Sequence, residues 1–213
     1  MKFDEFLKYI PKIANEFVSA TKAHEKMAPK ERLAELAQLD LSKKDVRNAA
    51  VMMLFYPKDT ITHLVLIIRA TYPGVHSSQI AFPGGKFEDT DADLKAAALR
   101  ETEEEIGVIK NSIEVIRPFS EIYIPPSNFL VSPFLGICKN ELTFILQEDE
   151  VAGIIELPLS DFMDDSNVVT RKLTTSYAVD IDVPAFLVKE HVVWGATAMM
   201  MSELKETLRM VFI

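Results

Sequence analysis

Four glutamates crowd the end of one predicted helix, and this feature constrains the chain more than any other. The stretch DADLKAAALRETEEEI is strong helix-forming sequence that stops at a glycine, so we expect a helix over 91–106. Its last turns hold four carboxylates, at Glu101, Glu103, Glu104 and Glu105. The helix dipole and mutual repulsion both disfavour anions there. The first, third and fourth are spaced i, i+3, i+4 and share one face, whereas the second points elsewhere.

A divalent cation would resolve this conflict. Carboxylates that are forced together raise one another's pKa unless a cation neutralises them. Mg²⁺ typically takes one or two carboxylates together with waters and substrate phosphates. Arg100 lies four residues before Glu104 and three before Glu103, close enough to hold a carboxylate in one rotamer. Just upstream, FPGG at 82–85 offers a glycine pair where the backbone can approach a ligand. The alternative is an ordinary solvated run of surface charge.

The charge balance argues against several classes of partner. The chain has 213 residues and a net charge of −9, which disfavours nonspecific binding to nucleic acid or an anionic membrane. A polyanionic small molecule would need a local cation site. No apolar run approaches the ~20 residues that span a bilayer, and the first residues, MKFDEFLKYI, read as an amphipathic helix and not as a signal peptide. We therefore expect a cytoplasmic protein, in which the single cysteine, Cys138, is buried.

The order of apolar patterns predicts an α/β fold with a mixed sheet covered by helices. Residues 1–45 read as an N-terminal helical extension, with helices at 3–17 and 29–38, and residues 46–213 as one domain. Apolar runs rich in β formers predict a hairpin from 49–57 and 63–70. Four later runs predict further strands, at 113–124, 129–138, 151–159 and 183–194.

Three helix ends carry recognisable signals. Thr90 followed by Asp93 has the form of a capping box for the mid-chain helix. Ser160 is placed to cap a short helix in SDFMDD. An amphipathic helix is expected over 196–211.

The region from Gly85 to Val108 resembles the Nudix box, the signature of the Nudix hydrolases. RETEEEIGV matches the second half of that pattern, except that Thr102 stands where the family has an aliphatic residue. The spacing from Gly85 to Arg100 is one residue longer than the common one, and Asp91 is the nearest counterpart of the usual mid-box glutamate. The longer spacing resembles the branch that includes the coenzyme A pyrophosphatases.

A second motif of that branch is similar to VLIIRATYPGVHSSQIAFPGG. This chain departs from it at Gly74, where an arginine is usual, and at Ser78, where a glycine is usual. The resemblance extends over roughly residues 45–210. It implies a Nudix fold, a mixed β-sheet sandwiched between helices, and hydrolysis of a diphosphate with Mg²⁺ or Mn²⁺.

Site residues follow from the same resemblance. Glu101, Glu104 and Glu105 would ligate the metal, one of them relaying a proton, with the Gly84 carbonyl completing the shell. Arg100 would orient a glutamate, with Glu104 favoured. Many family members take a further acid from a distant loop, for which Glu148 and Glu150 in QEDEVAG are candidates; plain surface charge is the alternative. Substrate contacts are expected from seven residues: Arg69, Gln79, Phe82, Gly85, Lys86, Tyr123 and Ser127.

Other features carry weaker signals. Arg69 would meet a substrate phosphate or else be a solvent charge at a strand end. His76 reads as an incidental loop residue, and YIPPSNF as either a rigid turn or a pocket wall. Trp194 and the run Met199–Met201 are expected to pack in the core.

The favoured reaction is cleavage of coenzyme A or an acyl-coenzyme A into 4′-phosphopantetheine (or its acyl form) and adenosine 3′,5′-bisphosphate. The alternatives are ADP-ribose, NADH or a nucleoside triphosphate as substrate. A non-catalytic nucleotide sensor is a further alternative, but such a protein would be expected to lose box carboxylates that this chain keeps. Family members are often dimers, so a homodimer is one possible state, but the sequence leaves the oligomeric state open.

Overall fold

The structure is a computed structural model that describes residues 1–17, 19–29, 32–33, 45–70, 79–175 and 179–212. Its helices are α1 (Phe3–Leu7), α2 (Ile10–Asn15), α3 (Ala20–Glu25), α5 (Leu94–Ile106), α6 (Leu159–Met163) and α7 (Gly195–Val211). Short 3-10 turns lie at Lys110–Ser112, Pro125–Ser127 and Asp165–Asn167. Its strands are β1 (Arg47–Lys58), β2 (Ile61–Arg69), β3 (Ile80–Ala81), β4 (Gly84–Lys86), β5 (Ile113–Pro118), β6 (Ile122–Ile124), β7 (Phe129–Cys138), β8 (Val151–Pro158), β9 (Val168–Leu173), β10 (Ile181–Val188) and β11 (His191–Val193).

The main sheet is mixed, as the sequence predicts. Its central path runs β3-β2-β1-β7-β5, while β8 pairs with β2, β4 with β1 and β6 with β7. β1 and β7 run parallel over nine residue pairs, from Arg47 opposite Phe129 to Phe55 opposite Ile137. The other pairings in this sheet are antiparallel, including the predicted β1–β2 hairpin. β9, β10 and β11 form a small second sheet.

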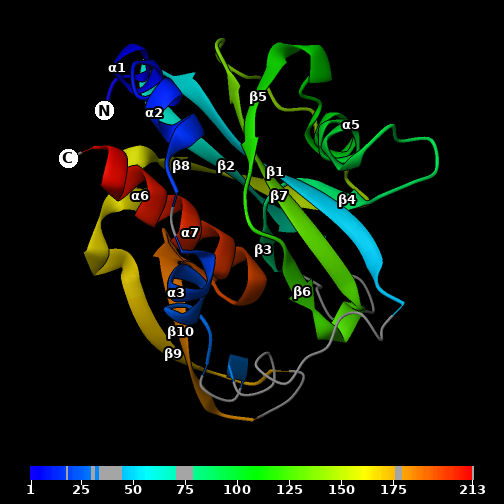
Figure 1. The fold of residues 1–213 in the computed structure, drawn as a ribbon, viewed down its shortest axis with the longest axis vertical. Coiled ribbons are helices and arrows are strands. Elements are labelled where there is room, and N and C mark those ends of the chain that lie inside the picture. The colour runs from blue at the N-terminus through cyan, green and yellow to red at the C-terminus, as the bar shows by residue number, and fades with distance from the viewer. Residues whose placement is uncertain (18, 30–31, 34–44, 71–78, 176–178, 213) are drawn as a thin grey trace.

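Side chains of β1 alternate between two apolar layers. Met53 and Phe55 belong to a core cluster shared with α7 and the N-terminal helices. Met52 and Leu54 belong to a second cluster shared with α5. Because successive strand residues point to opposite faces, the sheet lies between two helical layers, with α5 on one side and α7 on the other (Figure 1). The predicted α/β/α arrangement is confirmed.

The N-terminal helices pack on the same core as α7. The Phe6 ring lies 4.8 Å from the ring of Phe55. On α7, the Ser202 hydroxyl donates a 2.7 Å hydrogen bond to the Ala23 carbonyl of α3. The helix predicted over 3–17 is split into α1 and α2, and Pro11 lies in the first turn of α2, where its missing N–H costs nothing. The helix predicted at 29–38 falls mostly outside the described residues.

A buried carboxylate joins α3 to α7. His24 on α3 lies 2.9 Å from an oxygen of Glu203 on α7, and the Ser120 hydroxyl donates to the other oxygen at 2.8 Å. Burial acts to raise the pKa of Glu203, but the hydrogen bonds from His24 and Ser120 outweigh it and hold that pKa below its usual value.

Two predicted caps are wrong. Asp93 is itself the N-cap of α5, with extended backbone and a side chain that accepts a 2.7 Å hydrogen bond from the Ala96 N–H, so it is not the acid of a box capped by Thr90. α6 begins at Leu159, one residue before Ser160, whose hydroxyl donates to Asp161. The helix predicted to start at 91 therefore starts at 94, while its end at Ile106 is confirmed.

Other predictions hold in outline. α7 covers the helix expected over 196–211, and β7 matches its predicted bounds. The run at 113–124 is split between β5 and β6, and that at 183–194 between β10 and β11. β9 was not predicted, because only half of its sequence VVTRKL is apolar and its apolar residues do not alternate with polar ones. Cys138 is buried in β7, and no helix of the described chain is long and apolar enough to cross a bilayer.

Candidate metal and substrate site

The glycine pair of FPGG brings backbone directly against the acidic face of α5. The Gly84 N–H donates a 2.8 Å hydrogen bond to Oε2 of Glu105. A Cβ on Gly85 would lie only 2.4–2.5 Å from the carboxylate atoms of Glu101. Gly84 has φ +147°, and a Cβ there would lie 2.3 Å from the Ala50 carbonyl oxygen. Only glycines fit this turn without displacing the chain or a carboxylate.

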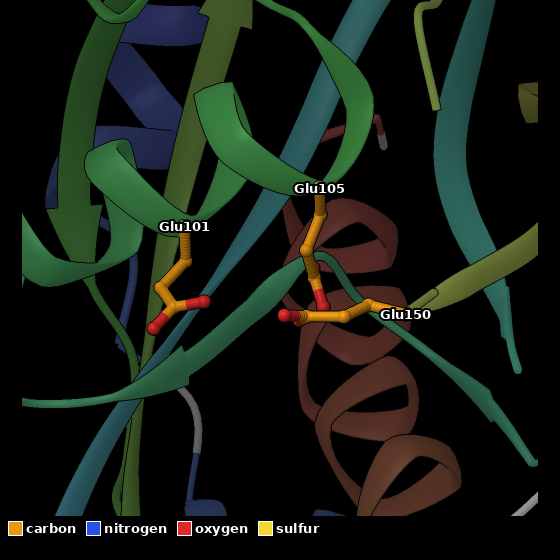
Figure 2. Close-up of side chains that lie close together, drawn as sticks. All are labelled: Glu101, Glu105 and Glu150. Carbon is orange, nitrogen blue, oxygen red and sulfur yellow. The ribbon is translucent and has the colours of Figure 1, made fainter. Parts of the chain in front are cut away.

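Three carboxylates converge at this turn. Glu101 and Glu105 come from consecutive turns of α5, and Glu150 enters from the turn before β8 (Figure 2). One oxygen from each lies within 4.8 Å of the others. The Glu150 carbonyl accepts a 2.8 Å hydrogen bond from the Ala70 N–H at the end of β2, which fixes the turn. Among the described residues, Glu150 and not Glu148 belongs to this group.

Burial makes this cluster electrostatically costly. Loss of solvent raises the pKa of Glu105 to about 8, although the Gly84 N–H and Arg69 act in the opposite direction. Burial also raises the pKa of Glu101, against hydrogen bonds from Arg100. Oε1 of Glu105 lies 3.6 Å from Nη1 of Arg69, beyond hydrogen-bond distance. The carboxylates are therefore crowded here with incomplete compensation, which disfavours their ionised forms.

The donor set fits a hard divalent cation. Within the described part of the chain, Oε1 of Glu105 and Nε of Arg69 are buried side-chain atoms that have no hydrogen-bond partner. A buried acceptor without a partner is costly, and a ligand that supplies positive charge would remove the cost. All three side-chain donors are carboxylate oxygens, the ligands preferred by Mg²⁺ and Mn²⁺.

Arg100 organises the rim of the cluster. Its guanidinium donates to Asp91 at 2.9 Å, to Glu101 at 3.0 Å, to Glu104 at 2.9 Å and to the Lys86 carbonyl at 3.0 Å. The Arg100 hydrogen bonds hold the pKa of Asp91 below its usual value. These contacts tie the helix to the preceding loop.

Glu104 does not join the other three carboxylates. Its side chain is 58% exposed and pairs with Arg100, so its assignment as a metal ligand stays a prediction. Glu103 points away from the group, toward Lys110 at 3.8 Å, in agreement with the helical spacing.

One cavity of about 530 Å³ contains the cluster. Its lining includes Arg100 and Glu104 and all seven residues predicted to contact substrate, from Arg69 to Ser127. The structure therefore brings these candidates together, and substrate contact by each remains a prediction. His76, Gly74 and Ser78 lie outside the described residues.

The sequence did not reveal part of this lining. Met27 and Arg32 lie in the N-terminal segment, to which no role was given. Trp194, Met199 and Met200 also line the cavity, although they were assigned to core packing. Helical periodicity marks such positions as buried, but it does not distinguish a side chain that fills a core from one that lines a cavity.

Comparisons with known proteins agree with this geometry. A family model of the NUDIX domain matches residues 46–176. Nudix hydrolase NudL of Cronobacter sakazakii is 33% identical over 178 residues, covering 78% of this chain and 85% of the relative. Nudix hydrolase NudL of an Enterobacter species is 34% identical over 169 residues, covering 74% and 81%.

Solved structures resemble the fold at low identity. A MutT/nudix family protein from Enterococcus faecalis is 18% identical with a TM-score of 0.52, covering 91% of this chain and 76% of its own. The Nudix hydrolase RenU from M. smegmatis is 14% identical with a TM-score of 0.53, covering 78% and 87%. These two likenesses support the arrangement of strands and helices alone.

Proposed function

We propose that this chain cleaves coenzyme A or acyl-coenzyme A. The chain belongs to the NUDIX family and is a Nudix hydrolase that acts on a diphosphate substrate. The products would be 4′-phosphopantetheine, or its acyl form, and adenosine 3′,5′-bisphosphate. The observation that carries the proposal is the meeting of Glu101, Glu105 and Glu150 with the Gly84 turn inside one cavity. The similarity of the FPGG region to coenzyme A pyrophosphatases supports the choice of substrate.

The reaction forms one bond and breaks one bond. A water oxygen attacks one phosphorus in line and the bridging P–O bond breaks. One of the two water protons passes to a carboxylate of the site, and two phosphate monoesters separate. When bound, a divalent cation neutralises charge on the phosphate oxygens and lowers the pKa of the attacking water. Glu101, Glu105 and Glu150 would hold that cation, with the Gly84 carbonyl as a neutral ligand.

Basic side chains at the cavity would bind the substrate anion. Arg69 lies beside Glu105, and its buried Nε has no hydrogen-bond partner among the described residues. A substrate phosphate oxygen would accept a hydrogen bond from this Nε. Lys86 follows the glycine turn and also lines the cavity. Arg100 would act as a positioning residue, because it fixes Glu101 and Glu104 by direct hydrogen bonds. Glu104 remains a candidate ligand or proton acceptor.

The proposal is tested by turnover with Mg²⁺ or Mn²⁺ against a substrate panel, with products identified by mass. The panel contains coenzyme A, acetyl-coenzyme A, ADP-ribose, NADH, diadenosine polyphosphates and nucleoside triphosphates. We expect preferential release of phosphopantetheine. Hydrolysis in ¹⁸O-labelled water would place the label on one of the two products and thereby identify the phosphorus attacked. A preference for another member of the panel would reject coenzyme A as the substrate.

A second candidate is a Nudix hydrolase with a different nucleotide substrate, such as ADP-ribose or NADH. Gly74 and Ser78 favour it, because they replace two residues that are usual in the coenzyme A branch. Homodimer formation and a cytoplasmic location stay predictions, and light scattering of the purified protein would test the first.

A further inference from the structure

Much of the cavity wall is apolar, which hydrolysis of a diphosphate does not require. Its walls include six apolar residues: Met27, Val51, Phe82, Ile122, Met199 and Met200. The three methionines are nearly buried in the folded chain, with 4%, 6% and 4% of their surface exposed in that order. Met199 and Met200 come from α7, which is visible behind the carboxylates in Figure 2, while Met27 follows α3.

The N-terminal segment is fixed in place as part of this wall. The Ser202–Ala23 and Glu203–His24 contacts hold α3 on α7, and Met27 lines the same cavity as Met199 and Met200 of that helix. Farther along, the Arg32 guanidinium donates a 3.0 Å hydrogen bond to the carbonyl of Tyr123 in β6, a strand that also lines the cavity. Met27, Pro29 and Arg32 lie outside the matched family region but line the cavity.

We propose that Met27, Met199 and Met200 form a subsite for the acyl chain of an acyl-coenzyme A, so that the N-terminal segment sets selectivity for acylated substrates. This inference rests on the proposed function. Methionine is unbranched and adaptable, which suits a flexible chain of variable length. The same cavity holds the carboxylate cluster, so the subsite requires the pantetheine arm to run within it from the diphosphate to the methionines. Its volume of about 530 Å³ is that of a small-molecule site.

The first test uses the wild-type protein and a series of straight-chain acyl-coenzyme A substrates, from unacylated to decanoyl. Each methylene that enters an apolar site strengthens binding about fourfold, so three of them should raise kcat/KM by about sixtyfold over the unacylated substrate. The gain should come from KM, because the chain contacts are equal in the ground state and the transition state. It should level off once the cavity is full.

The second test changes the wall. Met27→Gln keeps an unbranched side chain but adds an amide, which should lower the ratio of octanoyl- to unacylated-coenzyme A kcat/KM by about tenfold. Met163→Gln is the matched control: Met163 on α6 packs against the same core but is not among the described residues that line the cavity. Thermal melting of both variants is measured to check that each is folded at the assay temperature.

Each outcome decides the matter. A rising wild-type series together with a loss of selectivity in Met27→Gln alone supports the subsite. Hydrolysis of unacylated coenzyme A with a flat series overturns the subsite but leaves the proposed function standing. Equal loss of selectivity in Met27→Gln and Met163→Gln also overturns it, and should Met27→Gln fail to fold, Met200→Leu against Met201→Leu replaces the pair. Hydrolysis of ADP-ribose with none of any coenzyme A species overturns both proposals.

Discussion

Gly85→Ala should displace the Glu101 carboxylate while leaving the stability of the fold nearly unchanged. The new Cβ would lie 2.4–2.5 Å from the Glu101 carboxylate, whereas ordinary van der Waals contact begins near 3.4 Å. Glu101 would therefore move by about 1 Å, a misplacement that typically costs about 100-fold in rate, or about 2.7 kcal/mol of transition-state stabilisation. The backbone loses nothing, since Gly85 is not among the positive-φ glycines of the described chain.

Stability should change little, because the obstructing group is the end of a flexible side chain. We expect the free energy of unfolding to remain within about 1 kcal/mol of wild type, helped by the lower entropy of the unfolded chain. The assays are kcat/KM with the preferred substrate, urea unfolding, and Mn²⁺ affinity by titration calorimetry. Gly153→Ala on β8 is the control, because its Cβ would meet only the tip of Ile68 at 3.3 Å. Wild-type turnover and Mn²⁺ affinity in Gly85→Ala would refute the reasoning.

Three further results are expected. Glu150→Gln should lower kcat/KM by at least about 100-fold and weaken Mn²⁺ binding, while Glu148→Gln, outside the cluster, should match wild type; equal effects would reject Glu150 as the distant acid. Gly84→Ala should cost at least about 2 kcal/mol in urea unfolding, because its Cβ meets the backbone of Ala50; an unchanged urea midpoint would contradict this. The pKa of Glu203 in the folded protein is below its usual value of 4.5, so its carboxylate contributes stability above pH 4.5 that is lost as the pH falls through the folded-state pKa. Wild type should therefore lose more stability between pH 6 and pH 3 than Glu203→Gln.

Much of the fold could be predicted from the sequence, because the local patterns of apolar residues agree with the final packing. β1 reads as a continuous apolar run, and the structure buries both of its faces between α5 and α7. α5 ends where the glycine signal predicted, since Gly107 adopts the left-handed conformation with φ +71°. The caps at Asp93 and Ser160 were misread, because several polar residues in a row offer competing partners and only the folded backbone chooses among them.

The site was predictable where its residues share one motif and less so where they do not. Helical spacing grouped Glu101, Glu104 and Glu105 on one face, and the structure places the first and third in the cluster but leaves Glu104 exposed. The expectation that Arg100 holds a carboxylate agrees with its hydrogen bonds. The choice between Glu148 and Glu150 depends on the turn that precedes β8, which spacing cannot fix. The methionine wall depends on packing between α7 and a segment more than 150 residues earlier, and no local pattern records such a contact.

The parallel pairing of β1 with β7 has a consequence for how the chain folds. Each β1 residue from Arg47 to Phe55 pairs with a β7 partner 82 positions later, as Arg47 does with Phe129. Closing a loop of that length costs on the order of 4 kcal/mol in chain entropy before any contact forms. The hairpin to β2 and the docking of α5 can form early, because their contacts are closer in sequence. Until residue 137 is made, a growing chain would therefore carry Glu101 and Glu105 of α5 beside an unpaired apolar edge of β1, before Glu150 is present. In this interval the protein is most exposed to misassociation.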